Sequence, residues 1–345
     1  GLYAVVGTIN NVNYAGSASG TFYIAKATAA VTLGNLSQTY DGSPKSATAS
    51  TDPIGLTVDF TYDGSVTAPT NAGSYAVVGT INDANYAGSA SDTLVIAKAI
   101  ASVTLGDLAQ TYDGLPKPAT ASTDPIGLTV DFTYDGSATA PTNAGSYAVV
   151  GTINDANYVG SASDTLVIAK ATAVVTLDSL AQTYDGSPKS ATASTDPIGL
   201  TVDFTYDGSA TAPGNAGSYA VIGTINDANY AGSASDTLVI AKAAATVTLE
   251  SLAQTYDGLP KSATSVTNPL GLAVDFTYDG SATAPTNAGS YAVVGTINDA
   301  NYAGSASGTL VIAKATASVT LGDLAQTYDS LPKSATASTD PIGLT

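Results

Sequence analysis

The sequence predicts an all-β protein made of tandem, small, antiparallel β-sandwich domains, immunoglobulin-like in architecture and arranged as an elongated rod. Three observations support this fold class. The chain repeats every 72 residues, apolar and polar residues alternate over short runs, and Gly, Pro, Asn and Asp separate those runs. No stretch of useful length has the 3.6-residue apolar spacing that is typical of a helix.

The repeat is clearest in the segment Gln-Thr-Tyr-Asp, whose tyrosine recurs every 72 residues. A period of this length predicts an array in which each domain contacts mainly its neighbours. Boundaries placed after each Ile-Ala-Lys segment give four complete repeats between two partial ones. The predicted domains are 1–26 (C-terminal part of a repeat), 27–98, 99–170, 171–242, 243–314 and 315–345 (N-terminal part of a repeat).

The first half of the repeat 27–98 predicts two short strands and two turns. Residues 29–33 (AAVTL) alternate and predict the first strand, and Asp-Gly marks a turn at the end of 37–42. Residues 45–50 (KSATAS) predict a second strand of small side chains. Pro53 ends that strand, because proline has no N–H to donate to a neighbouring strand.

The second half of the repeat contains the strand with the strongest pattern, at 56–64 (LTVDFTYDG). Its even-numbered residues up to 62 are apolar and share one face, and Asp-Gly closes it. Further strands are expected at 74–81 and 93–98. We expect the core of this repeat to consist of Val31, Leu33, Tyr40, Leu56, Val58, Phe60, Tyr62, Tyr75, Val77, Ile81, Leu94 and Ile96.

The composition argues against several classes of function. The 345 residues carry a formal charge of −18 and include no Cys, His, Trp, Met or Arg. Without His and Cys, the commonest general base and the thiol nucleophile are absent, so we do not expect an enzyme. The negative charge argues against binding to nucleic acid or to an anionic membrane. No apolar run approaches the ~20 residues that a membrane helix needs.

The order of segments in each repeat resembles a known family. QTYDGSPK, VDFTYDGS, TAPTNAGSYAVVGTI and NYAGSASDTLVIAKA follow one another as in the MBG/YDG-type tandem repeats of bacterial cell-surface adhesins. The resemblance extends over the whole chain. It implies immunoglobulin-like β-domains in a long secreted protein, an extracellular location at the bacterial surface, and a role in spacing or adhesion. It implies no catalytic residue.

These observations predict a structural stalk or spacer segment of a secreted bacterial surface adhesin or fibre, which presents a distal function away from the cell. The expected partners are the neighbouring repeats. The junction 94–105 (LVIAKAIASVTL) contains no Gly or Pro, so we expect limited swing between consecutive domains. One alternative is an extracellular filament or matrix protein, in which copies of the chain complete each other by strand donation. A second is a calcium- or glycan-binding adhesive module.

The segment 82–92 (NDANYAGSASD) is the candidate for a metal loop. Its first Asp, second Asn and Gly fall at the first, third and sixth places of a calcium loop, but Ala and Leu occupy the fifth and twelfth places. An Asx turn is therefore favoured over a bound ion. We expect no cofactor, and calcium is kept as the alternative. Its candidate ligands are Asp83, Asn85, Asp92, Asp155, Asn157 and Asp164.

Two other sets of residues are candidates for acid–base catalysis or for covalent crosslinks. Asp59 and Asp63 are expected on one strand face, where paired carboxylates can perform acid–base catalysis, but a solvated face is favoured. Lys45 and Lys98 recur in every complete repeat, and similar adhesins form isopeptide crosslinks from such lysines. Solvated lysines are again favoured. The possible crosslink partners are Asn71, Asn82 and Asn85.

Overall fold

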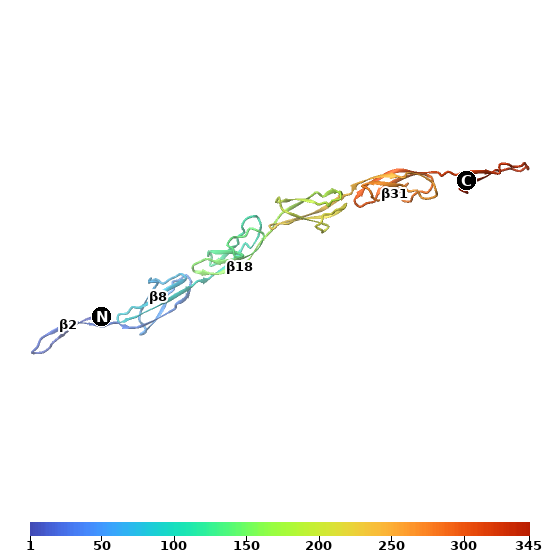
Figure 1. Cartoon of the computed structure of the whole chain (residues 1–345). Coiled ribbons are helices and arrows are strands. Elements are labelled where there is room, and N and C mark those ends of the chain that lie inside the picture. The colour runs from blue at the N-terminus through green and yellow to red at the C-terminus, as the bar shows by residue number, and fades with distance from the viewer. The chain divides into compact units, whose positions relative to one another are not determined.

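The structure, a computed structural model, describes residues 1–345 as strands and connecting loops (Figure 1). It contains no helix, and hence no helix long and apolar enough to cross a membrane. The chain divides into two compact units, Gly1–Ala171 and Thr172–Thr345. Each unit contains two complete repeats, which are described within their own unit below.

In the first unit, every complete repeat has the same succession of short and long strands. The strands are β1 (Leu2–Thr8), β2 (Ser17–Tyr23), β3 (Ala27–Thr28), β4 (Ala30–Gly34), β5 (Ser37–Thr39), β6 (Thr48–Asp52), β7 (Val58–Tyr62), β8 (Gly73–Ile81), β9 (Tyr86–Ala87), β10 (Ser89–Ala97), β11 (Ala99–Ile100), β12 (Ser102–Gly106), β13 (Ala109–Thr111), β14 (Thr120–Asp124), β15 (Val130–Tyr134), β16 (Gly145–Ile153), β17 (Tyr158–Val159) and β18 (Ser161–Ala169).

The second unit repeats that succession. β19 (Ala171–Thr172) spans the boundary between the units, and the strands after it are β20 (Val174–Asp178), β21 (Ala181–Thr183), β22 (Thr192–Asp196), β23 (Val202–Tyr206), β24 (Gly217–Ile225), β25 (Tyr230–Ala231), β26 (Ser233–Ala241), β27 (Ala243–Ala244), β28 (Thr246–Glu250), β29 (Ala253–Thr255), β30 (Thr264–Asn268), β31 (Val274–Tyr278), β32 (Gly289–Ile297), β33 (Tyr302–Ala303), β34 (Ser305–Ala313), β35 (Ser318–Gly322) and β36 (Thr336–Asp340).

Two sheets of unequal width form the sandwich of the repeat 27–98. The wider sheet has the order β5-β10-β8-β7, and the narrower sheet consists of β4 and β6 alone. The narrower sheet lies on the wider one through β4, which contacts both β10 and β8. An immunoglobulin constant-type domain packs a four-stranded sheet on a three-stranded one, so the sandwich of this repeat is a reduced version of that architecture. The predicted fold class, all-β with tandem immunoglobulin-like sandwiches, is confirmed.

The strand pairing differs from the prediction in one respect, because two short pairs are parallel. β5 runs parallel to β10, and β3 runs parallel to β9. The long pairs β8–β10, β7–β8 and β4–β6 are antiparallel, as expected. Segments of two or three residues are too short to show a period of two in the sequence, so the alternation pattern had no power to find β3, β5 or β9.

The core of the repeat 27–98 is smaller than the predicted one. Its fully buried cluster consists of Ala47, Tyr62, Val77, Leu94 and Ile96. The Tyr62 hydroxyl lies inside this cluster and accepts a hydrogen bond from the Ala47 N–H at 3.0 Å. Ile81 is also buried, as predicted, whereas the other predicted core residues are only half-buried. Those are Val31, Leu33, Tyr40, Leu56, Val58, Phe60 and Tyr75.

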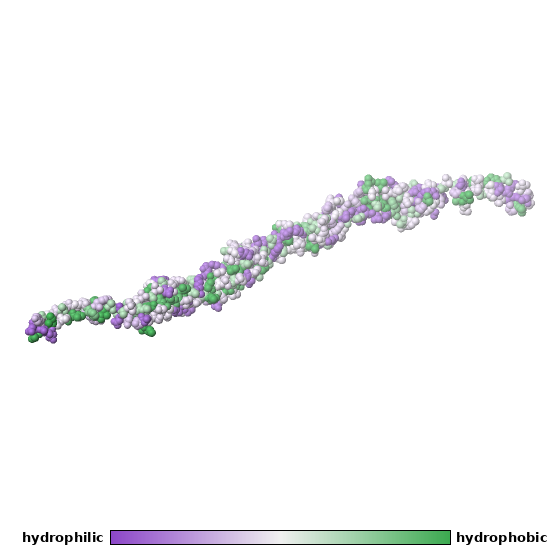
Figure 2. All heavy atoms as spheres, turned by 60° about the horizontal axis from the view of Figure 1, so that its bottom comes forward, coloured by the Kyte–Doolittle hydropathy of each residue, from purple (hydrophilic) through white to green (hydrophobic).

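Those side chains stay half-buried because the narrower sheet covers only part of the wider one. Ala47 was missed because alanine in a polar segment gives no apolar signal. The sheets approach most closely at Gly79 of β8, where a Cβ atom would lie 2.9 Å from Leu33 Cδ2. On the face drawn in Figure 2, hydrophobic residues lie in small patches among hydrophilic and neutral ones.

Several predicted strand ends shift in the structure. The strand predicted at 93–98 starts earlier, at Ser89, and the strand predicted at 45–50 is displaced to Thr48–Asp52. Pro53 ends that strand as expected. The strand predicted at 56–64 ends at Tyr62, because Asp63 and Gly64 turn the chain with φ of 46° and 82°. Tyr62 and Ser65 bridge across this turn, which confirms the predicted Asp-Gly closure.

Candidate inter-repeat interface

The loop that the sequence singled out as a metal candidate is built around an aspartate that bonds to its own backbone. Asp83 Oδ1 accepts from the N–H groups of Asn85 and Tyr86 at 2.7 and 3.0 Å. In the next repeat, Asp155 Oδ1 does the same with Asn157 and Tyr158, at 2.7 and 3.0 Å. The carboxylate thus fixes an Asx turn, as favoured from the sequence, and sets the direction of the two residues after it.

In the first unit, this turn brings Asn157 against the preceding repeat. Asn157 Oδ1 accepts from the Ala72 N–H at 2.8 Å, and Asn157 Nδ2 donates to Asn71 Oδ1 at 3.3 Å. Asn71 and Ala72 lie in the loop between β7 and β8. One side-chain amide therefore bonds with two groups of the neighbouring repeat.

An aromatic pair lies beside the two asparagines. The ring of Tyr40, which follows β5, meets the ring of Tyr158 edge to face, with centroids 5.4 Å apart and planes at 81°. Such a pair stabilises an interface by about 0.5–1.5 kcal/mol beyond the area it buries. The pair joins the repeat 27–98 to the repeat 99–170, so the contact is apolar as well as polar.

A lysine makes the return contact from the preceding repeat. Lys98 is the single residue between β10 and β11, and its Nζ donates to the backbone oxygen of Asp155 at 2.6 Å. Lys26 makes the same bond to Asp83, at 2.5 Å. The last residue of one repeat therefore holds the Asx turn of the next, and the same turn holds the preceding repeat through Asn157. We call these reciprocal contacts the clasp.

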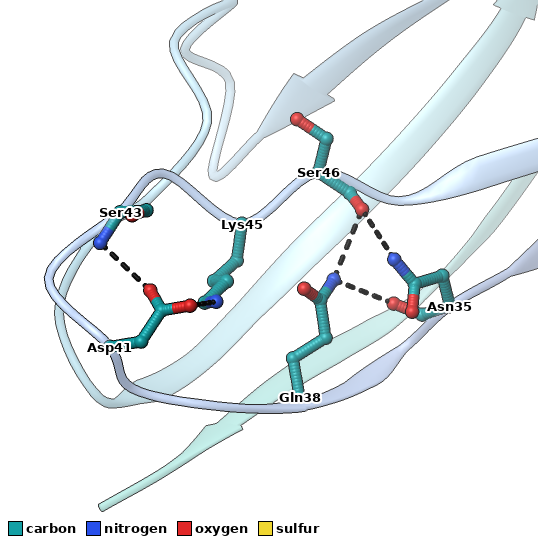
Figure 3. A network of polar contacts seen from close by, with 6 residues as sticks. All are labelled: Asn35, Gln38, Asp41, Ser43, Lys45 and Ser46. Atoms are coloured by element: carbon teal, nitrogen blue, oxygen red, sulfur yellow. Dashed lines mark hydrogen bonds and ion pairs between the residues drawn. The ribbon is translucent and has the colours of Figure 1, made fainter. Parts of the chain in front are cut away.

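A polar network holds the segment that carries Tyr40 (Figure 3). Gln38 Nε2 donates to the backbone oxygens of Asn35 and Ser46 at 2.9 and 3.0 Å, and Asn35 Nδ2 donates to the same Ser46 oxygen. These bonds tie the two sides of the segment together. The network therefore braces the segment that carries Tyr40, whose ring also packs against the core of its own repeat.

An ion pair closes the end of the same segment. Lys45 Nζ bonds with Asp41 Oδ2 at 2.5 Å, and Asp41 also accepts from the Ser43 N–H (Figure 3). The hydrogen bond from Lys45, followed by that from Ser43, lowers the pKa of the Asp41 carboxyl below its ordinary value. The corresponding aspartates have lowered pKa values for the same reasons. They are Asp113, Asp185, Asp257 and Asp329.

The second unit contains a clasp with the same geometry. Asn301 Oδ1 accepts from the Ala216 N–H at 2.8 Å, and its Nδ2 donates to Asn215 Oδ1 at 3.2 Å. Tyr184 and Tyr302 meet with centroids 5.4 Å apart, and Lys242 donates to the backbone oxygen of Asp299 at 2.6 Å. The same arrangement therefore occurs once in each unit, between repeats of nearly identical sequence.

Exposure of the tyrosine reports whether the clasp is present. Tyr40 and Tyr184 are half-buried beneath the following repeat, whereas Tyr256, which has no such ring against it, is 40% exposed. On the opposite side of the clasp, Asn157 is half-buried and Asn85 is exposed. The three tyrosines share the segment Gln-Thr-Tyr-Asp-Gly and the two asparagines share Asp-Ala-Asn-Tyr, so the difference in exposure follows the neighbouring repeat.

The remaining calcium candidates lie elsewhere. Asp92 and Asp164 are on β10 and β18, where each accepts a hydrogen bond from the N–H of the residue that follows it. No group of three or more acidic side chains is arranged to hold a metal ion. The side-chain oxygen of Asn157, one of the candidate ligands, instead accepts from the Ala72 N–H of the neighbouring repeat. Calcium binding stays a prediction.

The candidate residues for catalysis and crosslinks also have defined contacts. Asp59 Oδ2 accepts from Asn82 Nδ2 at 2.7 Å, while Asp63 lies in the turn and accepts from the Ala76 N–H. The expectation that the two carboxylates share one strand face is therefore wrong, because the strand ends before Asp63. The two lysines considered for crosslinks, Lys45 and Lys98, contact Asp41 and Asp155 rather than Asn71, Asn82 or Asn85.

Comparison with solved structures finds multidomain chains of low sequence identity. Sidekick-1 immunoglobulin domains 1–5 match at 12% identity over 83% of this chain and 81% of that chain, with a TM-score of 0.27. The ICAM-5 D1–D4 ectodomain fragment matches at 12% over 82% and 99%, with a TM-score of 0.29. Drosophila N-cadherin EC1-4 matches at 11% over 72% and 85%, with a TM-score of 0.22. No curated protein matches in sequence.

The sequence model of the MBG domain matches the whole chain as consecutive segments. The matched residues are 1–28, 29–100, 101–172, 173–244, 245–316 and 317–345. These segments have the same 72-residue period as the repeats identified from the sequence, with starts two residues later. The resemblance to MBG-type repeats is confirmed, and the chain belongs to the MBG domain family.

Proposed function

We propose that this chain is a structural stalk or spacer segment of an extracellular bacterial surface protein. The observation that carries the proposal is the clasp, which occurs with matching distances in both units. Side-chain contacts on both sides of each junction oppose swing between consecutive repeats. An array with restricted bending at its junctions keeps its two ends apart, which is what a spacer requires.

The link between repeats supports the same function. Lys98 is the only residue between β10 and β11, and neither glycine nor proline interrupts the junction. A flexible tether would instead be rich in Gly and Ser. The charge of −18 supports an extended, soluble array, because like charges on successive repeats repel. The proposal assigns no chemical reaction to the chain.

Small-angle X-ray scattering on repeat-number variants tests the spacer function. Deletion of residues 99–170 removes one repeat in frame and recreates the same junction sequence. A strand of nine residues spans about 30 Å, so we expect the maximum dimension to fall by at least about 30 Å per repeat removed.

A matched variant inserts six Gly and Ser residues between Lys98 and Ala99. This variant keeps every sandwich but separates the two sides of the clasp, so the repeats on either side can swing. The distribution of interatomic distances from scattering should therefore broaden. If maximum dimension followed the square root of residue number, as for a flexible chain, the spacer function would be refuted.

A further inference from the structure

β7 is an edge strand whose outer side is partly free. The N–H of Asp63 donates to the oxygen of Ala76 in β8, and the N–H of Asn82, which follows β8, donates to the Thr57 oxygen. Odd-numbered residues thus direct their backbone groups toward β8, and the alternation of a strand directs those of Val58 and Phe60 to the opposite side. Tyr62, the next in this series, is already bonded to Ser65.

A hollow lies against this edge where the narrower sheet ends. The narrower sheet has only two strands, and it contacts β10 and β8 through β4, whereas an immunoglobulin domain has further strands in the corresponding sheet. Val58 and Phe60 consequently remain half-buried. The hollow has a volume of about 490 Å³ and is lined by Ser46, Ala47, Val58, Asp59, Phe60, Thr61, Tyr62, Val66 and Ala68.

The surroundings of the hollow are acidic. Asp59 lines it, and Asp63 follows at the end of β7. Both carboxylates accept hydrogen bonds from amides, whereas Lys45 pairs with Asp41 instead. No lysine lines the hollow. The edge thus combines free backbone groups, an apolar floor and uncompensated negative charge, and it repels other copies of this acidic chain.

We propose that the free edge of β7 binds an extended, lysine-rich segment of a partner protein as an added strand. The segment would bond to the backbone of Val58 and Phe60, in line with the bridge that Ser65 already makes to Tyr62. Its apolar side chains would enter the hollow, and its cationic side chains would lie beside Asp59. Strand addition of this kind draws affinity from backbone bonds and specificity from alternate side chains.

The same edge occurs once in each complete repeat. β15, β23 and β31 also end their sheets and have the same burial pattern as β7. A partner with several such segments would therefore gain avidity along the array. This binding activity goes beyond the spacer function and does not depend on it.

A peptide titration of the whole chain tests the proposal. The probe is an acetylated, amidated nonapeptide of alternating Lys and Val, with binding followed by isothermal titration calorimetry. We expect four peptides per chain, one for each strand equivalent to β7. Two further peptides carry N-methyl groups, one on every Lys and the other on every Val. Only one of these sets of N–H groups can face the edge, so one peptide should lose binding and the other should retain it.

Paired variants separate the edge from general charge attraction. Asp59, Asp131 and Asp203 are changed to Asn in one variant, and Asp92, Asp164 and Asp236 in the other, so both lose three charges. We expect the first set to weaken affinity about two- to five-fold per site and the second to have little effect. No binding at millimolar peptide, equal binding of both N-methylated peptides, or equal weakening by both variants would overturn the proposal.

Discussion

At the junction between the repeats 27–98 and 99–170, Asn157 satisfies two polar groups that belong to another repeat. The Ala72 N–H is half-buried there and has Asn157 Oδ1 as its acceptor at 2.8 Å. A donor that loses its acceptor at such a site costs about 1–3 kcal/mol, more than the bond itself contributes. The stability of the junction therefore depends strongly on the side-chain amide of Asn157, although the sequence marks this residue only as part of a turn.

Replacing Asn157 by Ala should lower the free energy of unfolding by about 1–2 kcal/mol, because both bonds to the preceding repeat are lost. Urea denaturation of the whole chain measures this. Asn85→Ala is the matched control, since Asn85 is in the same Asx turn with an exposed side chain, and it should change stability by less than about 0.5 kcal/mol. Equal effects of the two changes would show that the loop, and not the clasp, is responsible.

The ion pair beside Tyr40 makes a prediction for acid. Lys45 holds the pKa of Asp41 below its usual value of 3.8, and four further lysine–aspartate pairs act alike. A folded-state pKa below the unfolded one means that the stabilisation is present above pH 3.8 and is lost as pH falls through the folded value. Because the aspartates are exposed to solvent, we expect a modest fall in the melting temperature as the pH drops below about 4.

The variant for this test changes Lys45, Lys117, Lys189, Lys261 and Lys333 to Gln. It should melt lower than the parent at pH 7 and approach it at pH 3, because the parent has then lost the same interaction. If the melting temperatures of the two proteins changed with pH in parallel, the lysine–aspartate pairs would not be the cause of the acid sensitivity.

At the scale of elements, the approach of β9 to the start of the repeat leaves no space for a side chain. A Cβ atom on Gly88 would lie 2.1 Å from the backbone oxygen of Ala29, next to the parallel pair β3–β9. A backbone atom cannot move aside as a flexible side chain can. The glycine in the segment NYAGS is thus required by packing, whereas the sequence pattern indicated it only as the sixth place of a calcium loop.

Gly88→Ala should therefore destabilise the repeat 27–98 by about 2–4 kcal/mol, since the backbone must shift and the bonds of β3 to β9 are strained. The control is Gly20→Ala on β2, where a Cβ atom meets nothing within 4 Å. Thermal melting of the two proteins distinguishes them. Similar melting temperatures would mean that β3 and β9 contribute little to stability.

The sequence predicted the long strands because they are long enough to show a period of two. Val77, Leu94 and Ile96 are buried as expected, whereas Val78 and Val95, which alternate with them along the strands, are exposed. The strands β5 and β9 were not predicted because they are too short to show this period. The clasp was not predicted from the sequence because its residues, such as Asn71 and Asn157, lie 86 residues apart and resemble ordinary turn residues. One available signal was that Tyr40 and Tyr158 each adjoin a segment of turn residues, where a large aromatic residue needs a partner.

At the scale of the whole molecule, the chain is a series of small cores joined by recurring clasps within the units. A sandwich of 72 residues buries only about 60% of its unfolded surface, so each has modest stability by itself. Contacts with neighbours then contribute a large share of the total. Arrays of this kind behave approximately as a sum of repeat and junction terms.

Proteins with one, two and three complete repeats should accordingly show a melting temperature that rises with repeat number, most between one and two. Scanning calorimetry provides the measurement. The comparison series has the residues equivalent to Asn157 changed to Ala in every repeat, and its dependence on repeat number should be flatter. A melting temperature independent of repeat number in the parent series would show that the junctions are not coupled.

The clasp has a consequence for how such a gene varies over time. Each copy of the 72-residue sequence encodes the tyrosine and asparagine of one side together with the Asx turn of the other. Unequal recombination that adds or removes whole copies therefore joins matching surfaces at every new boundary, without any compensating mutation. The number of repeats then changes in whole steps of 72 residues, and the clasp at each new boundary keeps both of its sides.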